Sequence, residues 1–249
     1  MSRLAGMRVM LARPHDSSQD LARALRAEGA IVSNVPLIQI TAPSDPEALQ
    51  ANVDGADAAD WLVFTSANGV AAFARRRRAP LSSRVRIAAV GPATAAAVHA
   101  MLHRAVDVIP GRHDAEALAS AMLAVAKPRA SIHVFQPEDA RSSVATRLEA
   151  AGYLVHVAAA YRTLEIPPPD IARLVAGADA IVLMSGSQAR ALARGLGETN
   201  RAALGHATVI AVGARTEREA VRAGLRVDAT ADDASPPAIA AAIATTRKR

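Results

Sequence analysis

The chain has 249 residues, of which 51% are hydrophobic and 21% charged, a composition typical of a folded soluble protein. It contains no cysteine, which excludes disulfides, thiolate catalysis, zinc–thiolate sites and iron–sulfur clusters. The formal net charge of +6 suits acidic partners, but arginine-rich and alanine-rich sequences also arise from genomic base composition. Because only 2% of the residues are aromatic, we expect no nucleic-acid partner.

Short apolar runs alternate with helical patterns along the chain, which predicts parallel sheets with crossover helices. Strands are expected at residues 8–12, 31–35, 61–65, 86–90, 131–135, 154–157, 180–184 and 208–212. Helices are expected at residues 20–27, 70–77, 93–102, 115–126, 142–150, 188–196, 215–223 and 237–244. A polar turn at residues 14–18 joins the first strand to the first helix.

The two halves of the chain carry the same landmarks in the same order. A strand followed by a proline, an Asp–strand–Ser segment and a V-G-x-x-T motif each occur twice, about 120 residues apart. Gly91 and Thr94 correspond in this way to Gly213 and Thr216. The repetition predicts an α/β fold made from one duplicated half.

Polar residues follow four of the predicted strands, at the strand ends where open α/β sheets bind ligands. These residues are Ser66, Asn68, Gly91, Thr94, Ser185, Ser187, Gly213 and Thr216. A helix that begins there offers free backbone N–H groups and partial positive charge, so it can hold a carboxylate or phosphate. Any single serine could instead serve only as a helix cap. Four such ends together predict a site for a small polyanion.

Several kinds of cofactor and targeting signal have no counterpart in the sequence. There is no G-x-G-x-x-G after a strand and no G-x-x-x-x-G-K-[ST], which argues against a nucleotide cofactor. His99 and His103 lie four residues apart on a predicted helix without an evident third ligand, so we expect no metal site. No segment is apolar enough for a signal peptide or a membrane span, so we expect a cytoplasmic protein with no membrane partner.

Three further features allow more than one interpretation. The run Arg75–Arg78 could bind nucleic acid, but it ends a predicted helix, where cations stabilise the dipole. Residues 195–197, Gly-Leu-Gly, follow a helix and are interpreted as its terminator. Tyr161 lies where the two copies join, and its phenol could donate a proton or anchor the chain by a hydrogen bond.

Together these features resemble the uroporphyrinogen-III synthase family, enzymes of tetrapyrrole biosynthesis. The likeness covers nearly the whole chain. It rests on Arg13-Pro14, DWLVFTSANGV (60–70), AVGPAT (89–94), DAEALA (114–119), Tyr161-Arg162-Thr163 and AVGARTEREAVRAG (211–224).

The resemblance implies two three-layer α/β domains with parallel sheets, joined by a two-stranded antiparallel linker, in a monomer. One domain would combine residues 1–36 and 166–249, and the other would span residues 42–158. Residues 37–41 and 159–165 would form the linker. The first domain would then be discontinuous in sequence.

The implied activity is the cofactor-free cyclisation of hydroxymethylbilane, a linear tetrapyrrole polycarboxylate, with loss of water and inversion of ring D. Tyr161 matches the family tyrosine proposed to assist the leaving hydroxyl, and its loss should weaken activity rather than abolish it. Substrate carboxylates would be bound by Arg13, Ser66, Asn68, Gly91, Thr94, Ser185, Ser187, Gly213 and Thr216.

The sequence departs from the family pattern at two strand ends. Residues 136–139, Gln-Pro-Glu-Asp, stand where the family often has an Arg-Gly turn, and they add an acidic pair. Residues 185–187, Ser-Gly-Ser, replace a Thr-Ser-Pro-like stretch. These departures keep open an alternative, a non-catalytic binding or regulatory protein of the same fold.

Overall fold

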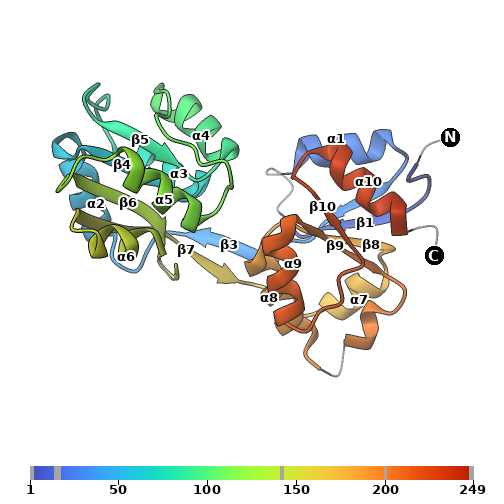
Figure 1. The fold of residues 1–249 in the computed structure, drawn as a ribbon. Helices are drawn as coiled ribbons and strands as arrows, with labels where there is room; N and C mark the ends of the chain where they lie inside the picture. The colour runs from blue at the N-terminus through green and yellow to red at the C-terminus, as the bar shows by residue number, and fades with distance from the viewer. Residues whose placement is uncertain (1–2, 14–17, 141–142, 199–200, 247–249) are drawn as a thin grey trace. The chain divides into compact units, whose positions relative to one another are not determined.

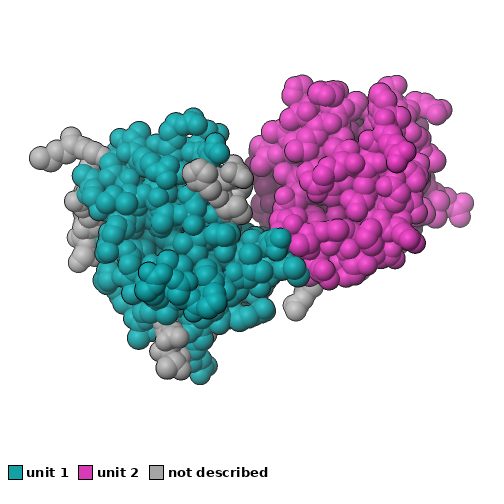
Figure 2. Space-filling view, turned by 180° about the vertical axis from the view of Figure 1, so that it is seen from behind, with its two compact units in different colours: residues 1–39, 164–249 teal, residues 40–163 magenta. Residues whose placement is uncertain are grey.

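The computed structural model describes residues 3–13, 18–140, 143–198 and 201–246. Its internal contacts divide the chain into two compact units (Figure 2). Unit 1 comprises residues 1–39 and 164–249, and unit 2 comprises residues 40–163. Unit 2 is therefore an insertion into the sequence of unit 1.

Unit 1 is built on a sheet of five strands in the order β10-β9-β8-β1-β2. All neighbouring strands of this sheet run parallel. The strands are β1 (Arg8–Leu11), β2 (Ile31–Asn34), β8 (Ala180–Leu183), β9 (Thr208–Val212) and β10 (Ala229–Ala231). The helices are α1 (Gln19–Ala27), α7 (Ile171–Ala176), α8 (Gly186–Leu196), α9 (Gly213–Arg222), α10 (Pro236–Thr246) and the 3-10 helix η2 (Arg201–Leu204).

Helices cover both faces of this sheet, which gives unit 1 three layers. Alternate strand residues point to opposite faces, so Ile181 belongs to one core cluster and Val182 to another. The first cluster packs against α7, α8 and α9, and the second against α1 and α10. Figure 1 shows α1 and α10 side by side. Because both faces are covered, the central strands are apolar throughout.

Unit 2 contains the second sheet, in the order β3-β7-β6-β4-β5. Strands β7, β6, β4 and β5 run parallel. The strands are β3 (Ile38–Thr41), β4 (Trp61–Phe64), β5 (Arg86–Ala89), β6 (Ser131–Pro137) and β7 (Leu154–Glu165). The helices are α2 (Pro46–Asp54), α3 (Ala67–Arg76), α4 (Pro92–Leu102), α5 (Ala115–Val125), α6 (Ser143–Ala150) and the 3-10 helix η1 (Gly55–Ala58).

Unit 2 also has three layers, and one of its two core clusters holds all three phenylalanines of the chain. Phe64 stacks on Phe135 with ring centroids 5.2 Å apart, and Phe73 meets both rings edge-on. This cluster lies under α2, α3 and α4, whereas the cluster on the other face lies under α5 and α6. The aromatic cluster therefore fixes α3 against the ends of β4 and β6.

The chain crosses from one unit to the other through two neighbouring strands, β3 and β7. The Ile166 N–H donates to the Leu37 carbonyl, and the Thr41 hydroxyl lies 3.5 Å from the Arg162 carbonyl. This register makes the pair antiparallel. The sequence predicted one strand at residues 154–157, and the family resemblance implied a separate linker strand at residues 159–165. In the structure the two form a single strand, β7, which runs through 12 residues to Glu165 because its partner changes from β6 to β3.

The two sheets have equivalent strand orders. Residue Val108 bridges β5 in parallel next to Ala88, as β10 does next to β9. Unit 2 therefore shows the series Val108-β5-β4-β6-β7, and unit 1 shows β10-β9-β8-β1-β2. A duplicated half would produce the same order in both units, and the duplication stays a prediction from the sequence.

Every predicted strand and helix has a counterpart, but helices α2 and α7, strand β10 and the two 3-10 helices η1 and η2 were not predicted. Strand β10 has three residues and α7 only six, too few to show a period. Helix α2 had a detectable signal, since Asp45 caps it at 2.8 Å and Pro46 opens it. Residues 14–17 of the turn predicted at 14–18, and the predicted helix start at residue 142, lie outside the described residues. No helix in the described ranges is long and apolar enough to cross a membrane.

A buried histidine of β6 should make stability depend on pH. His133 is 7% exposed, its Nδ1 has no partner among the described residues, and its ring lies 4.7 Å from that of His156. Burial, followed by the charge of His156, lowers the pKa of His133 below its usual value of 6.5. The unfolded chain then binds a proton that the folded chain does not, so stability falls as pH drops below about 6.5 and levels off under the folded pKa.

We expect His133→Leu to lose less stability than the wild type between pH 7.5 and 5.5, as measured by urea unfolding at both pH values. Exposed His99 provides the control, because His99→Ala should keep the wild-type difference. Equal pH dependence in wild type and His133→Leu would contradict this assignment.

Candidate functional site

The best-defined contact among the predicted site residues joins Ser66 to Tyr161 in unit 2. The two hydroxyl oxygens lie 3.0 Å apart, and either group can be the donor. Ser66 follows β4 and is the N-cap of α3, where its oxygen accepts the Gly69 N–H at 3.1 Å. Tyr161 lies in β7 and is 7% exposed. A buried phenol is thus oriented by a serine that is itself held by a helix start.

Asn68 does not take part in this arrangement. The sequence left open whether Ser66 or Asn68 caps the helix, and the structure assigns the cap to Ser66. Asn68 is the second residue of α3 and lies outside the buried face of that helix. Helix α3 consequently begins three residues earlier than the predicted 70–77 range.

The start of α4 differs from that of α3, because no side chain caps it. Its N-cap is Gly91, and its first helical residue is Pro92. Thr94 was predicted near the helix opening, and it occupies the third helical position. The Thr94 side chain is 4% exposed, and its hydroxyl has no hydrogen-bond partner within the described ranges. This hydroxyl is not a fully buried atom, so it still reaches the surface.

Glu138, the first residue of the acidic pair after β6, has a structural role. The strand continues to Pro137, two residues past the predicted end, with an irregularity in its pairing between Gln136 and Pro137. Glu138 accepts the Ser44 N–H at 2.8 Å, and its own N–H donates to the Tyr161 carbonyl. The bonds from Ser44 lower the pKa of Glu138. Glu138 thereby fastens the segment before α2 instead of remaining free.

In unit 1, Ser185 and Ser187 lie together at the start of α8. Ser185 is the N-cap and accepts the Gln188 N–H at 3.3 Å, and its hydroxyl lies 3.0 Å from that of Ser187. Buried Gln188 accepts the Met184 N–H at 2.7 Å, which closes the turn. This helix start is therefore occupied by its own side chains, as is that of α3.

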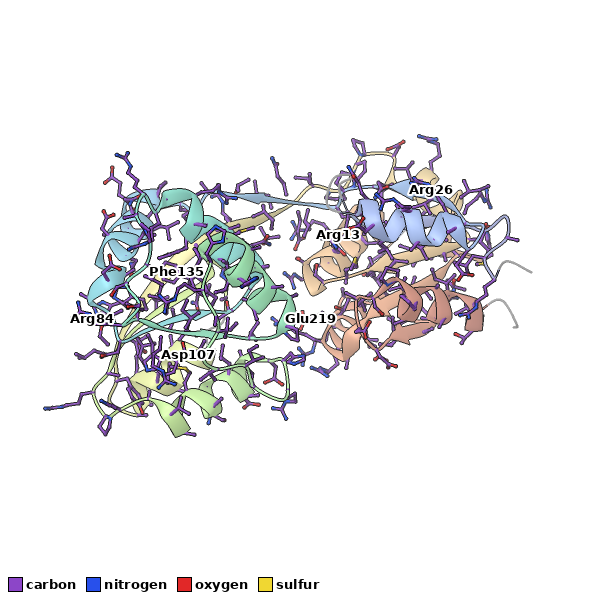
Figure 3. All side chains as sticks on the ribbon, turned by 90° about the horizontal axis from the view of Figure 1, so that it is seen from above. Arg13, Arg26, Arg84, Asp107, Phe135 and Glu219 are labelled. Carbon is purple, nitrogen blue, oxygen red and sulfur yellow. The ribbon has the colours of Figure 1, made fainter. Side chains whose placement is uncertain are left out.

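A glycine is required between the two serines. A Cβ atom at Gly186 would lie 2.8 Å from Cγ of Glu219 on α9. Glu219 is labelled in Figure 3 and forms ion pairs with Arg190 and Arg222. Its negative charge is therefore balanced within unit 1. The Ser-Gly-Ser departure from the family pattern thus reflects close packing of α8 on α9.

The start of α9 resembles that of α4 in having no side-chain cap. Gly213 has φ +76°, a conformation that side-chain residues rarely adopt, and a Cβ there would meet nothing within 4 Å. Thr216 is 5% exposed, and its hydroxyl also lacks a hydrogen-bond partner among the described residues. The helix begins at Gly213, two residues before the predicted range.

The four strand ends therefore fall into two classes. Strands β4 and β5 are neighbours, as are β8 and β9, so each unit places one capped start beside one uncapped start at the same sheet edge. The starts of α3 and α8 are capped by serines, and those of α4 and α9 are open. Open starts leave backbone N–H groups available to an anion.

Arg13 lies at the same edge of unit 1, just after β1, and is labelled in Figure 3. Its Nη1 is 3.5 Å from the sulfur of Met184, the residue before Ser185. Partial burial lowers the pKa of the Arg13 guanidinium, which nonetheless stays charged at neutral pH. Arg13 thus adds a cation near the α8 start. The neighbouring Pro14, which belongs to the same motif, lies outside the described residues.

Two other predicted features have structural roles. Arg77, in the run Arg75–Arg78, is the C-cap of α3 and pairs with Asp57 at 2.6 Å. The run borders a cavity of about 720 Å³ in unit 2 that contains none of the predicted site residues. Gly197 ends α8 with φ +59°, as predicted, whereas Gly195 lies inside the helix against Pro167.

No group of three or more histidine, aspartate or glutamate side chains in the described ranges is arranged to hold a metal ion. His99 lies within α4 and His103 caps its end.

Two residues at these edges were missed by sequence reasoning: Gln188 and His113. The signal for Gln188 was weak, because a glutamine three residues after a serine is common at helix starts. His113 packs against Gly91, and nothing in the local sequence indicated that contact.

The comparisons with known proteins agree with this architecture. Residues 19–241 match a family model described as uroporphyrinogen-III synthase HemD. The fold resembles a mutant uroporphyrinogen III synthase from the extremely thermophilic bacterium Thermus thermophilus, with a TM-score of 0.66 and 18% identity over 98% of this chain and 99% of that one. It also resembles uroporphyrinogen-III synthetase from Helicobacter pylori, with a TM-score of 0.61 and 16% identity over 94% and 96% of the two chains.

At these identities the solved structures establish the fold alone, whereas the family model covers most of the sequence. That match and the two parallel sheets lead to one conclusion: the chain belongs to the uroporphyrinogen-III synthase family, cyclising hydro-lyases of tetrapyrrole biosynthesis.

Proposed function

We propose that this chain converts hydroxymethylbilane to uroporphyrinogen III, losing water and inverting ring D, without a cofactor. The substrate is an octacarboxylate, so its recognition requires several anion sites at fixed positions. The proposed work of the protein is to hold those carboxylates so that the uninverted closure is suppressed. We further propose that the enzyme acts as a cytoplasmic monomer.

The observation that carries this proposal is the pair of uncapped helix starts, one in each unit. At α4 and α9 the backbone N–H groups of the first turn have no side-chain cap, and the helix dipole adds partial positive charge. Thr94 and Thr216 add hydroxyls that lack partners among the described residues. One carboxylate fits each start as acceptor of N–H and O–H bonds. Arg13 supplies a cation for a further carboxylate in unit 1.

We assign to Tyr161 the role of donating a proton to the departing hydroxyl of the substrate. When the C–O bond of the substrate breaks, the leaving oxygen needs one proton to depart as water, and a phenol O–H can donate it. If Ser66 donates to the phenol oxygen, this hydrogen bond orients the phenol, and the O–H bond of the phenol is directed away from Ser66. The negative charge that develops on the phenol is then stabilised by the Ser66 hydroxyl. The α-carbon of ring D that already carries the bridge to ring C captures the resulting carbocation, which forms the new C–C bond. The old bridge bond then breaks and re-forms at the other α-carbon of ring D, so that the ring is inverted, and the proton lost from that carbon restores the Tyr161 phenol.

Tyr161→Phe should reduce kcat by about ten- to a hundredfold and leave KM nearly unchanged, because the hydroxyl acts on the leaving group rather than on carboxylates. The aromatic ring is retained, so unit 2 should keep its core. Single-turnover rates with hydroxymethylbilane measure the effect. Tyr153→Phe, which removes a phenol bonded to the Ala126 carbonyl, is the matched control and should keep the wild-type rate.

The isomer composition of the product tests the proposed function. Hydroxymethylbilane closes spontaneously to the type I isomer, so we expect the purified chain to yield type III in excess of that background. If only type I is formed while the product analogue uroporphyrin III still binds, the chain is a binding protein of the same fold and not a synthase.

A further inference from the structure

His113 lies against the open start of α4. It stands between Val108, which bridges β5, and α5, which begins at Ala115. A Cβ atom built on Gly91 would lie 3.1 Å from Cβ and 3.2 Å from Cγ of His113. Gly91 has φ −175°, an extended conformation that any residue adopts. A side chain at position 91 would therefore crowd His113, whereas the backbone angles there place no restriction on the residue type.

The imidazole is the unpaired polar group in an otherwise paired segment. Arg112, just before it, forms ion pairs with Asp114 and Glu116, and Asp114 also caps α5. His113 is exposed and has neither a hydrogen bond nor an ion pair among the described residues. The charged groups of the neighbouring residues are thus paired with one another, and the imidazole stays available to a ligand.

A second observation at the same helix start points to a ligand. Thr94 is 4% exposed and carries a hydroxyl without a partner in the described part of the chain. The N-cap provides no side chain, so the Ala93 and Thr94 N–H groups are also uncapped. The imidazole therefore flanks a group of donors that has no acceptor in the described ranges.

We propose that His113 is a substrate-binding residue, whose ring N–H donates to the carboxylate held at the start of α4. This inference rests on the proposed function. At the α9 start of unit 1 no described side chain packs on the corresponding glycine, because a Cβ at Gly213 would meet nothing within 4 Å. The α4 start therefore binds its carboxylate with one donor more than the α9 start, and it is the more selective of the two.

The experiment measures kcat and KM for hydroxymethylbilane, and the affinity for uroporphyrin III by fluorescence titration. We expect His113→Ala to raise KM and the uroporphyrin III dissociation constant by about three- to tenfold, with kcat within about twofold of wild type. His113→Asn keeps an N–H donor and should recover part of the loss. His99→Ala, on α4 itself and also exposed, is the matched control and should change neither value.

A double-mutant cycle with Gly91 separates this role from a general disturbance of the helix. Gly91→Ala places a methyl group where His113 lies, so it should weaken uroporphyrin III binding through displacement of the imidazole. In the His113→Ala background the same change should then cost little further affinity. Full additivity of the two losses would overturn the proposal.

Failure of this inference is distinguishable from failure of the proposed function. Type III product from wild type, together with unchanged KM and unchanged uroporphyrin III affinity in His113→Ala, overturns only the role of His113. If wild type forms only type I, the synthase proposal fails and the titration with uroporphyrin III still decides whether His113 binds a carboxylate.

Discussion

Replacing both Thr94 and Thr216 by valine should lower kcat/KM for hydroxymethylbilane by about a hundredfold, with each single change giving about tenfold. Each hydroxyl lies at an uncapped helix start and has no partner among the described residues that would be lost with it. Valine keeps the shape of the side chain and removes only the donor. The two residues belong to different units, so their effects should add as free energies.

These substitutions should lower activity without lowering the free energy of unfolding. Because neither hydroxyl bonds to the described part of the protein, its removal leaves no buried partner unsatisfied. Urea unfolding of the double variant should match wild type within about 0.5 kcal/mol. Thr230→Val in β10 is the matched control for activity. Wild-type kcat/KM in the double variant would show that these helix starts do not bind the substrate.

Replacing Phe135 by alanine should lower the free energy of unfolding of unit 2 by about 3 to 5 kcal/mol. Phe135, labelled in Figure 3, is fully buried in the cluster with Phe64 and Phe73. The cavity left behind would border both of these rings. The Phe135 carbonyl also accepts from the Thr65 N–H and hydroxyl, which connects the cluster to the turn before Ser66. Loss of the ring should therefore also disturb the Ser66 cap.

The single tryptophan of the chain, Trp61, lies in β4, so its fluorescence follows the unfolding of unit 2 specifically. Far-ultraviolet circular dichroism follows both units, and a difference between the two transitions would show that the units unfold separately. Val157→Ala, at a residue of β7 that is 43% exposed, is the control and should cost less than about 1 kcal/mol. If Phe135→Ala also lowers the free energy of unfolding by less than about 1 kcal/mol, the aromatic cluster does not determine the stability of unit 2.

The α/β fold class was predictable because its signal is local. Runs such as residues 61–64 and 180–183 are apolar at every position, which is what a strand covered on both faces requires. The elements that escaped prediction lack such a signal. Helix α2 buries only Leu49 and Val53, so its apolar period is faint. That residues 154–157 and 159–165 form one continuous strand, β7, depends on pairing with distant β3 and so was not visible in the local sequence.

The sequence predicted which strand ends carry the candidate site, but it did not predict what each side chain does there. Parallel strands place their carboxyl ends at one edge, so the sequence could locate Ser66 and Ser185 there. Whether a serine turns back to cap its own helix depends on its side-chain torsion, which sequence does not reveal. The contact of Gly91 with His113 likewise joins segments whose proximity follows from the bridge of Val108 to β5.

The insertion of unit 2 into unit 1 has a consequence for the order of folding on the ribosome. Val9 in β1 pairs with Ala180 in β8, so the two central strands of unit 1 meet only after the whole of unit 2 has been synthesised. Unit 2 is contiguous in sequence and can fold as soon as it emerges. Until β8 has been synthesised, the nascent β1–α1–β2 segment exposes the apolar residues of β1, which leaves them open to aggregation.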